Sequence, residues 1–178
     1  MKPTVDEKGI GDRSSADNAR DLVLLLGEAK ADNIISMLTP EQRNSFDIVI
    51  TADQVVTHKG EILEKPDSPD TARRYIRSYG HAPCSTVGSI VLTHIASGLR
   101  VSGTDTTTIF LKHIPEPVID DLIEEGEVFY CAGGLMIEHP KVEPFIERIE
   151  GTIDSVMGLS ESLLWRLLED LLPKIKIS

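Results

Sequence analysis

Residues 46–56 read Phe-Asp-Ile-Val-Ile-Thr-Ala-Asp-Gln-Val-Val, and this stretch decides the fold class. Its β-branched residues predict a strand, and the unbroken run Ile48-Val49-Ile50 is typical of a strand that is buried on both faces. The residues that follow, His58-Lys59-Gly60-Glu61, are typical of a turn. If that turn closes a hairpin, the chain returns along the strand and Lys65 lies near Asp53.

The sequence on either side of this strand alternates between helical and β patterns. Upstream, a loop over residues 1–13 leads to Ser14 and Ser15, which can cap a helix that runs to about Leu38. Downstream, the pattern predicts a helix from Ser68-Pro69 to Gly80, β structure over 84–114 with a turn at Ser97-Gly98, an acidic helix from Pro115 to Gly126, short strands at 135–137 and 145–149, and a last helix after Gly158. This order predicts one α/β (α+β) domain over residues 1–178, with a mixed, largely antiparallel sheet flanked by helices.

Composition limits the classes of function. The chain has 178 residues, 40% of them hydrophobic and 26% charged, which is ordinary for a globular domain. The formal net charge of −11 disfavours a nucleic acid polymer or an anionic membrane as partner, because both need basic surfaces. Two distant cysteines, Cys84 and Cys131, exclude a disulfide scaffold, and the first residues do not have the apolar core of a signal peptide. We therefore expect a cytoplasmic protein without a membrane span.

Asp53 is the strongest candidate for chemistry, because a carboxylate that interrupts an apolar strand must be paired, hydrated or functional. Together with Lys65 it could hold a metal-bound phosphate, with the aspartate as metal ligand or general base and the lysine as phosphate clamp. A structural ion pair at the end of a strand is the alternative.

Three further features each have a functional and a structural interpretation. Lys30 lies on or beside the apolar stripe of its helix, where a lysine either extends to solvent or serves a site. Cys131 is either a nucleophile or a small core residue. The glycine-bracketed stretch 151–159 enters a helix and is either an anion site or an ordinary turn.

Taken together, six short motifs are more specific than any one of them. In chain order they are Asp6-Glu7, Glu28-Ala29-Lys30-Ala31, Ala52-Asp53-Gln54-Val55-Val56, Lys65-Pro66, Cys131-Ala132-Gly133 and Gly158-Leu159. The series resembles the Maf family of nucleoside triphosphate pyrophosphatases, which share a broad fold group with inosine triphosphate pyrophosphatases. The resemblance runs from about Val5 to the last helix. It implies hydrolysis of a nucleoside triphosphate to the monophosphate and pyrophosphate with a divalent metal cation, Mg²⁺ or Mn²⁺, and a possible homodimer.

The resemblance also implies roles for particular residues. Asp53 matches the family's proton acceptor and would act with or through the metal, and Glu7 matches an acidic position that helps to hold it. Lys30 and Lys65 match lysines that hold the triphosphate. Gln54 after Asp53, Cys131-Ala132-Gly133 and the later Glu138 are similar to the branch that acts on 7-methylguanosine triphosphate, whose methylated base carries a positive charge that a carboxylate favours.

The sequence departs from the family pattern at its start. Family members begin with a strand and a Ser-x-Ser-Pro-Arg-Arg phosphate loop, whereas this chain starts just before the Asp6-Glu7 motif. That departure motivates the alternative of a catalytically degenerate protein that binds nucleotides or interacts with a partner. A thiol enzyme that uses Cys131 is a third hypothesis.

Overall fold

A single five-stranded sheet organises the chain, and the computed structural model describes residues 1–175 of it. The strands are β1 (Ile48–His58), β2 (Glu61–Leu63), β3 (Cys84–His94), β4 (Arg100–Leu111) and β5 (Ile146–Glu150). Their order across the sheet is β2-β1-β3-β4-β5, and every neighbouring pair is antiparallel. The expected antiparallel sheet flanked by helices is confirmed.

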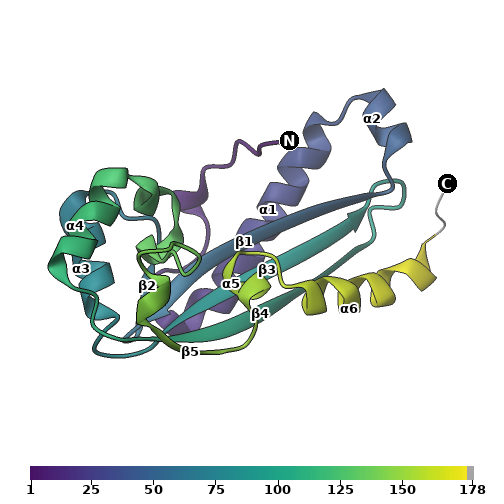
Figure 1. Cartoon of the computed structure of the whole chain (residues 1–178). Helices are drawn as coiled ribbons and strands as arrows, with labels where there is room; N and C mark the ends of the chain where they lie inside the picture. The colour runs from purple at the N-terminus through teal and green to yellow at the C-terminus, as the bar shows by residue number, and fades with distance from the viewer. Residues whose placement is uncertain (176–178) are drawn as a thin grey trace.

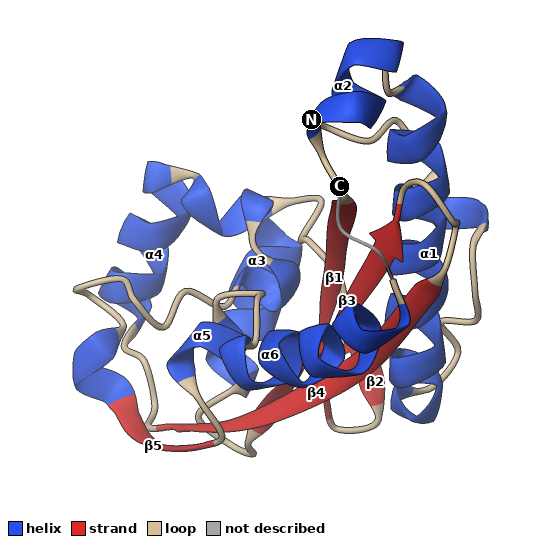
Figure 2. Ribbon diagram, turned by 90° about the vertical axis from the view of Figure 1, so that its right-hand side faces the viewer, coloured by secondary structure: helices blue, strands red, loops and turns tan. Residues whose placement is uncertain are grey.

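Helices cover both faces of this sheet and one end of it (Figure 1). They are α1 (Ala19–Met37), α2 (Pro40–Ser45), α3 (Pro69–Ser78), α4 (Glu116–Glu125), α5 (Ile153–Val156) and α6 (Glu161–Leu171). Helix α1 packs on β1 and β3, and α6 packs on β4 and β3 from the opposite face (Figure 2). Helices α3 and α4 pack on each other and form a lobe at one end. Within residues 1–175, no helix is both long and apolar enough to cross a bilayer.

Successive side chains of a strand point to opposite faces of the sheet, so the apolar side chains of the strands form a separate part of the core on each face. Val55 and Val87 are opposite each other in register and pack against α1, together with Leu22 and Leu26. The other face carries Ile90 and Leu92 against α6, and the largest cluster fills the α3–α4 lobe. Each face of the sheet is therefore anchored by its own helix.

Helix ends follow the expected capping chemistry at two places and differ at a third. Ser68 accepts a hydrogen bond from the Thr71 backbone with Pro69 in the first turn, and Gly126 ends α4 with a φ of +83°. Helix α3 ends at Ser78 with Tyr79 as its cap, so Gly80 stands directly after the helix end, as expected, but its φ is not positive. A Cβ at Gly80 would lie 2.7 Å from the His113 Cα, so close packing of two segments is the reason for that glycine.

Two other expectations also fail. Residues 135–137 form no strand, because the chain turns there and the β5 strand begins only at Ile146. Ile50 was expected to be buried, but it is 48% exposed. The physical reason lies in the pairing of β1: strand β2 pairs only with Val56–His58, so within the described residues β3 is the only strand beside the stretch 48–55. This open edge of β1 positions the candidate site.

Candidate active site

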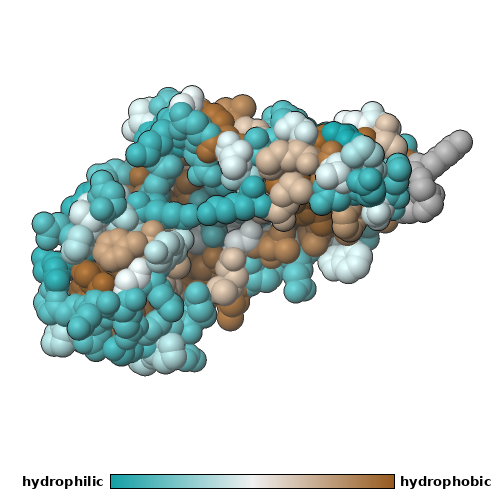
Figure 3. Space-filling model, turned by 90° about the horizontal axis from the view of Figure 1, so that it is seen from above, coloured by the Kyte–Doolittle hydropathy of each residue, from teal (hydrophilic) through white to brown (hydrophobic). Residues whose placement is uncertain are grey.

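A cavity of about 540 Å³ lies over the open edge of β1, a size within the usual range of small-molecule sites. Its walls come from seven regions of the chain: the N-terminal segment, α1, β1, residues 64–65, Thr86 of β3, the segment 130–138 and residues 156–158. The face seen in Figure 3 is hollowed between the lobe on the left and the rest of the molecule, and mostly hydrophilic side chains surround the hollow. Segments far apart in the sequence therefore meet at one concave place.

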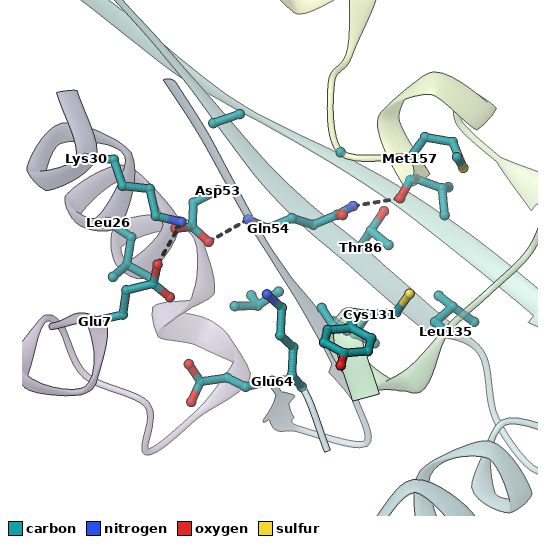
Figure 4. Close-up of a pocket in the computed structure, with 18 of the residues that line it drawn as sticks. Glu7, Leu26, Lys30, Asp53, Gln54, Glu64, Thr86, Cys131, Leu135 and Met157 are labelled. Carbon is teal, nitrogen blue, oxygen red and sulfur yellow. Dashed lines mark hydrogen bonds and ion pairs between the residues drawn. The ribbon is translucent and has the colours of Figure 1, made fainter. Parts of the chain in front are cut away.

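The cavity reaches both faces of the sheet. Thr51 and Val55 face α1, so Asp53 between them faces α1 as well. Gln54 points to the opposite face, where its side chain bonds to the α5 turn. Figure 4 shows Asp53 on one side of the strand and Gln54 extending to the other. Both can line one cavity because strand β2 does not yet cover the edge at these positions.

The close approach of α1 to the sheet places Lys30 at Asp53. A Cβ on Gly27 would lie 3.0 Å from side-chain atoms of Ser89 and Val91, so any larger residue at this position would push these side chains by a few tenths of an ångström. Thr51 donates a hydrogen bond to the Gly27 carbonyl at 2.7 Å and fixes the register of helix on strand. Lys30 follows three residues later on the same face of α1.

Lys30 bridges two carboxylates at the charged end of the cavity (Figure 4). Its Nζ lies 2.5 Å from Asp53 Oδ2 and 3.0 Å from Glu7 Oε1. The Lys30 and Asp53 side chains are only 17% and 9% exposed, whereas Glu7 is 47% exposed. Both residues predicted for metal and one residue predicted for phosphate thus form one partly buried ionic cluster.

Burial and ion pairing have opposite effects on the pKa values of this cluster. Burial raises the pKa of Asp53 above its ordinary value, although Lys30 and the Gln54 backbone N–H oppose the rise. Burial lowers the pKa of Lys30, but Asp53 and Glu7 together outweigh that effect, and the net pKa is raised. Asp53 is therefore a carboxylate with increased proton affinity beside a lysine that stays charged, which suits a proton acceptor.

A residue outside the sequence prediction, Arg13, fixes the position of Glu7. The 3₁₀ turn Glu7–Gly9 is capped by Asp6, whose carboxylate accepts from the Lys8 backbone. Arg13 donates to the Glu7 carbonyl at 2.7 Å and to the carboxylate of Glu64 at 3.0 Å. It thereby ties the turn that carries Glu7 to the segment that carries Lys65. The guanidinium group of Arg13 can bind both segments at once, because it has several N–H donors in one plane. The sequence did not indicate this role, because the two segments meet only in the folded chain.

Lys65 and Glu138, both predicted to bind substrate, line the same cavity. The side chains of both residues form no hydrogen bond or ion pair with residues 1–175, and the side chain of Lys8, which the sequence prediction omitted, shares both properties. A charged side chain without a protein partner at a cavity wall is available to a ligand.

Gln54, the remaining predicted substrate residue, has a partly structural function. Its Nε2 donates to the carbonyls of Ser155 and Val156 at 3.1 and 3.0 Å, which ties β1 to the α5 turn. Gln54 Oε1 lies near Gly158, where a Cβ would approach it to 3.4 Å. Because both protons of the amide are used, the oxygen is the part of Gln54 that remains for a ligand.

Cys131 lines the cavity but lacks the environment of a nucleophile. Burial raises the pKa of its thiol, the nearby Glu138 and Glu127 raise it further, and Lys65 opposes them only in part. A thiolate is the reactive form of cysteine, so this environment disfavours the thiol-enzyme hypothesis.

The carboxylates of the cluster fit a divalent cation that is shared with a ligand. Asp53 Oδ2 is buried, touches Lys30 and accepts no regular hydrogen bond from the described residues. No group of three or more His, Cys, Asp or Glu side chains in residues 1–175 is arranged to enclose a metal. Mg²⁺ is commonly held by one or two carboxylates together with phosphate oxygens and water, which matches Glu7 and Asp53.

With this geometry established, comparison with known proteins identifies the family. The model of the family described as Maf-like protein matches residues 1–171. The chain belongs to the Maf family. A 7-methyl-GTP pyrophosphatase of Dictyostelium discoideum is 35% identical over 170 residues, which cover 94% of this chain and 83% of that protein.

Other Maf-family relatives carry different names. A nucleoside triphosphate pyrophosphatase of Salinispora tropica is 33% identical over 173 residues, 96% of this chain and 75% of the relative. A dTTP/UTP pyrophosphatase of Salinibacter ruber is 32% identical over 121 residues, 68% of this chain and 59% of the relative. The Maf membership inferred from the motifs is confirmed, while the roles of the individual site residues stay predictions.

Proposed function

We propose that this chain is a nucleoside triphosphate pyrophosphatase that releases pyrophosphate and leaves the nucleoside monophosphate. The observation that carries the proposal is the buried Asp53 carboxylate, ion-paired to Lys30 and open to a cavity that also holds the unpaired Lys65. The names of the Maf-family relatives support the same reaction.

The charges of the cavity indicate how a triphosphate would be accommodated. Lys8, Lys30 and Lys65 line it together with the carboxylates of Glu7, Asp53, Glu64 and Glu138. Positive and negative side chains nearly balance, so the lysines alone do not neutralise a polyanion. A triphosphate therefore needs an added cation, and Glu7 and Asp53 are the residues that would hold it. When bound, a divalent metal supplies charge neutralisation at the phosphates and lowers the pKa of bound water.

The chain's own residues account for the rest of the reaction. Lys65, and Lys30 once it is drawn from the carboxylates, hold phosphate oxygens at the charged end of the cavity. A water oxygen attacks the α-phosphorus, and Asp53 accepts the proton that this water loses. The bond between the α-phosphorus and the bridging oxygen breaks, and that oxygen leaves with the pyrophosphate. Burial favours this role of Asp53, because it raises the proton affinity of the carboxylate.

We further propose that the nucleotide is 7-methylguanosine triphosphate. Glu138 is exposed and unpaired within the described residues, so its carboxylate is free to receive the N1 and N2 edge of guanine and to favour a cationic base. Gln54 offers its remaining oxygen at the same cavity. The similarity to the Dictyostelium protein supports this choice.

The test is pyrophosphate release by the purified chain with Mg²⁺ or Mn²⁺ on 7-methylguanosine, guanosine, uridine and thymidine triphosphates. We expect the methylated substrate to give the highest kcat/KM, and Asp53→Asn to lower kcat by about 10²–10⁴-fold. Asp21→Asn is the matched control, because Asp21 is exposed on α1 and does not line the cavity. Equal activity of Asp53→Asn and wild type would contradict the role of Asp53 as base.

The catalytically degenerate alternative predicts a different result in the same assay. Folded wild-type protein would then bind nucleotide without releasing pyrophosphate from any of the four substrates. Turnover that requires metal and disappears in Asp53→Asn excludes that alternative.

A further inference from the structure

The cavity is divided into a charged end and an apolar end. Figure 4 shows Glu7, Lys30 and Asp53 on one side, Cys131, Leu135 and Met157 on the other, and Gln54 between them. Since phosphates require the charged end, the base of a nucleotide extends toward the apolar end. This step rests on the proposed function, which places a nucleotide in the cavity.

Tyr130 lines the cavity next in sequence to Cys131, and its exposure is unusual. It is 80% exposed, more than any other large apolar side chain in residues 1–175. An aromatic ring that stays in water gains none of the favourable free energy of apolar burial. Such a ring at a cavity wall is therefore a candidate for contact with a ligand.

The backbone around Tyr130 is fixed, so the exposed ring is not on a loose loop. Val128 is completely buried, and Phe129 packs against the main core. The Cys131 backbone N–H donates to the Val128 carbonyl at 3.3 Å, and the Gly133 N–H donates to the Glu64 carbonyl at 2.9 Å. The segment is thus anchored on both sides of Tyr130 and presents the ring on a rigid turn.

We propose that Tyr130 is the base platform of the site and that its ring selects a nucleobase with a delocalised positive charge. The face of a tyrosine ring attracts cations, and a purine methylated at N7 is a flat cation that can stack on it. Glu138 contributes charge at the same cavity, but a carboxylate alone recognises an edge and gives no stacking surface.

The test compares Tyr130→Phe with Tyr130→Leu. Phenylalanine keeps the aromatic face, whereas leucine keeps apolar bulk without it. The measurements are kcat/KM for 7-methylguanosine triphosphate and for guanosine triphosphate, and the affinities of the corresponding monophosphates by calorimetry. We expect the preference for the methylated form to fall by about threefold to tenfold in Tyr130→Leu and to persist in Tyr130→Phe. Trp165→Leu is the control, because Trp165 is 65% exposed on α6 and lies outside the cavity.

Three results would overturn the assignment of Tyr130. One is a preference for the methylated form that stays unchanged in Tyr130→Leu, whether or not activity on both nucleotides falls equally, another is an equal loss of preference in Tyr130→Phe, and the third is a similar loss of preference in the control Trp165→Leu. The monophosphate affinities separate this inference from the proposed reaction. If wild type releases no pyrophosphate but its preference for the methylated monophosphate is lost only in Tyr130→Leu, the proposed hydrolysis fails and the base platform stands.

Discussion

The Lys30 ammonium has two carboxylate partners, Asp53 and Glu7, and the partner with the shorter contact is buried. The lysine therefore compensates the charge that Asp53 would otherwise carry alone in a desolvated position. The same contact lowers the proton affinity of Asp53, while burial raises it. Lys30 thus has two separable effects, one on phosphate binding and one on the pKa of Asp53.

Replacing Lys30 with methionine removes both effects. Because Lys30 lowers the pKa of Asp53, its loss raises that pKa further, and the base becomes protonated at a higher pH. The acidic limb of the profile of kcat/KM against pH then moves toward higher pH, and kcat/KM falls by about 10- to 100-fold at neutral pH. The measurement is the full pH profile of wild type and Lys30→Met.

Lys65→Met is the matched comparison for that profile. Lys65 lines the same cavity but forms no ion pair with Asp53. We expect it to raise KM and to leave the acidic limb in place. Movement of the limb in both variants, or in neither, would contradict the coupling of Lys30 with Asp53.

At the scale of elements, Arg13 connects the turn Glu7–Gly9 to Glu64, the residue before Lys65. Arg13→Gln leaves a polar side chain but loses the guanidinium fork, so the turn that carries Glu7 loses its link to Glu64 and only the ion pair with Lys30 holds the Glu7 carboxylate near Asp53. We expect the concentration of Mg²⁺ that gives half-maximal activity to rise by about three- to tenfold, with little change at saturating metal. Arg20→Gln is the control, because Arg20 is exposed and outside the cavity. A loss of activity that saturating metal does not restore would argue against this role.

The segment 131–134 depends on one close contact with α3 and β1. Gly133 has a φ of +62°, and a Cβ there would lie 2.5 Å from Tyr79 Oη and 2.9 Å from Val56 Cβ. We expect Gly133→Ala to lower the free energy of unfolding by about 2–4 kcal/mol, through backbone strain and overpacking together.

Gly126→Ala separates the two causes, because Gly126 has a φ of +83° and no atom within 4 Å of the added Cβ. It should cost about 1 kcal/mol in the same denaturant titration. Equal losses in the two variants would contradict the packing argument.

At this scale, a structural feature can be predicted from the sequence when the residues that cause it are close neighbours in the chain. Ser68 and Gly126 fix helix ends through their own backbone and side-chain chemistry, so their positions could be read from the residues. The sequence also placed Gly80 at the end of α3, but not the reason for that glycine, because the residue it packs against is His113, more than thirty residues away. The apolar triplet 135–137 has the composition of a strand, but no partner strand lies beside it, and the chain turns instead.

At the scale of the whole molecule, the candidate site exists because β2 is short. Pairing that begins only at Val56 leaves the edge at Asp53 and Gln54 open, and one cavity can then reach both faces of the sheet. The alternation of a strand places adjacent residues on opposite faces, so their meeting in one site could not follow from the strand pattern alone. The motifs supplied Asp53 and Lys65, whereas Arg13 and Tyr130 required the folded arrangement.

This arrangement makes ligand binding a property of the whole fold. The walls of the cavity come from residues 7–8, α1, β1, residues 64–65, Thr86 of β3 and the segments 130–138 and 156–158. A bound nucleotide would therefore hold all of these segments in place. A ligand that binds only the folded state stabilises it by about 2.7 kcal/mol at a concentration one hundred times its Kd. For a chain of this size that corresponds to a rise in Tm of roughly 5–10 °C. An analogue of 7-methylguanosine triphosphate with a methylene group in place of the oxygen between the α- and β-phosphates allows the measurement on wild type, because that bond cannot be hydrolysed and both Glu7 and Asp53 remain to hold Mg²⁺. We expect the rise in wild type and a much smaller one in Lys65→Met, with Mg²⁺ alone as the blank. If the nucleotide leaves Tm unchanged at millimolar concentration, the cavity is not its site, and both the reaction and the degenerate binding alternative would have to be abandoned.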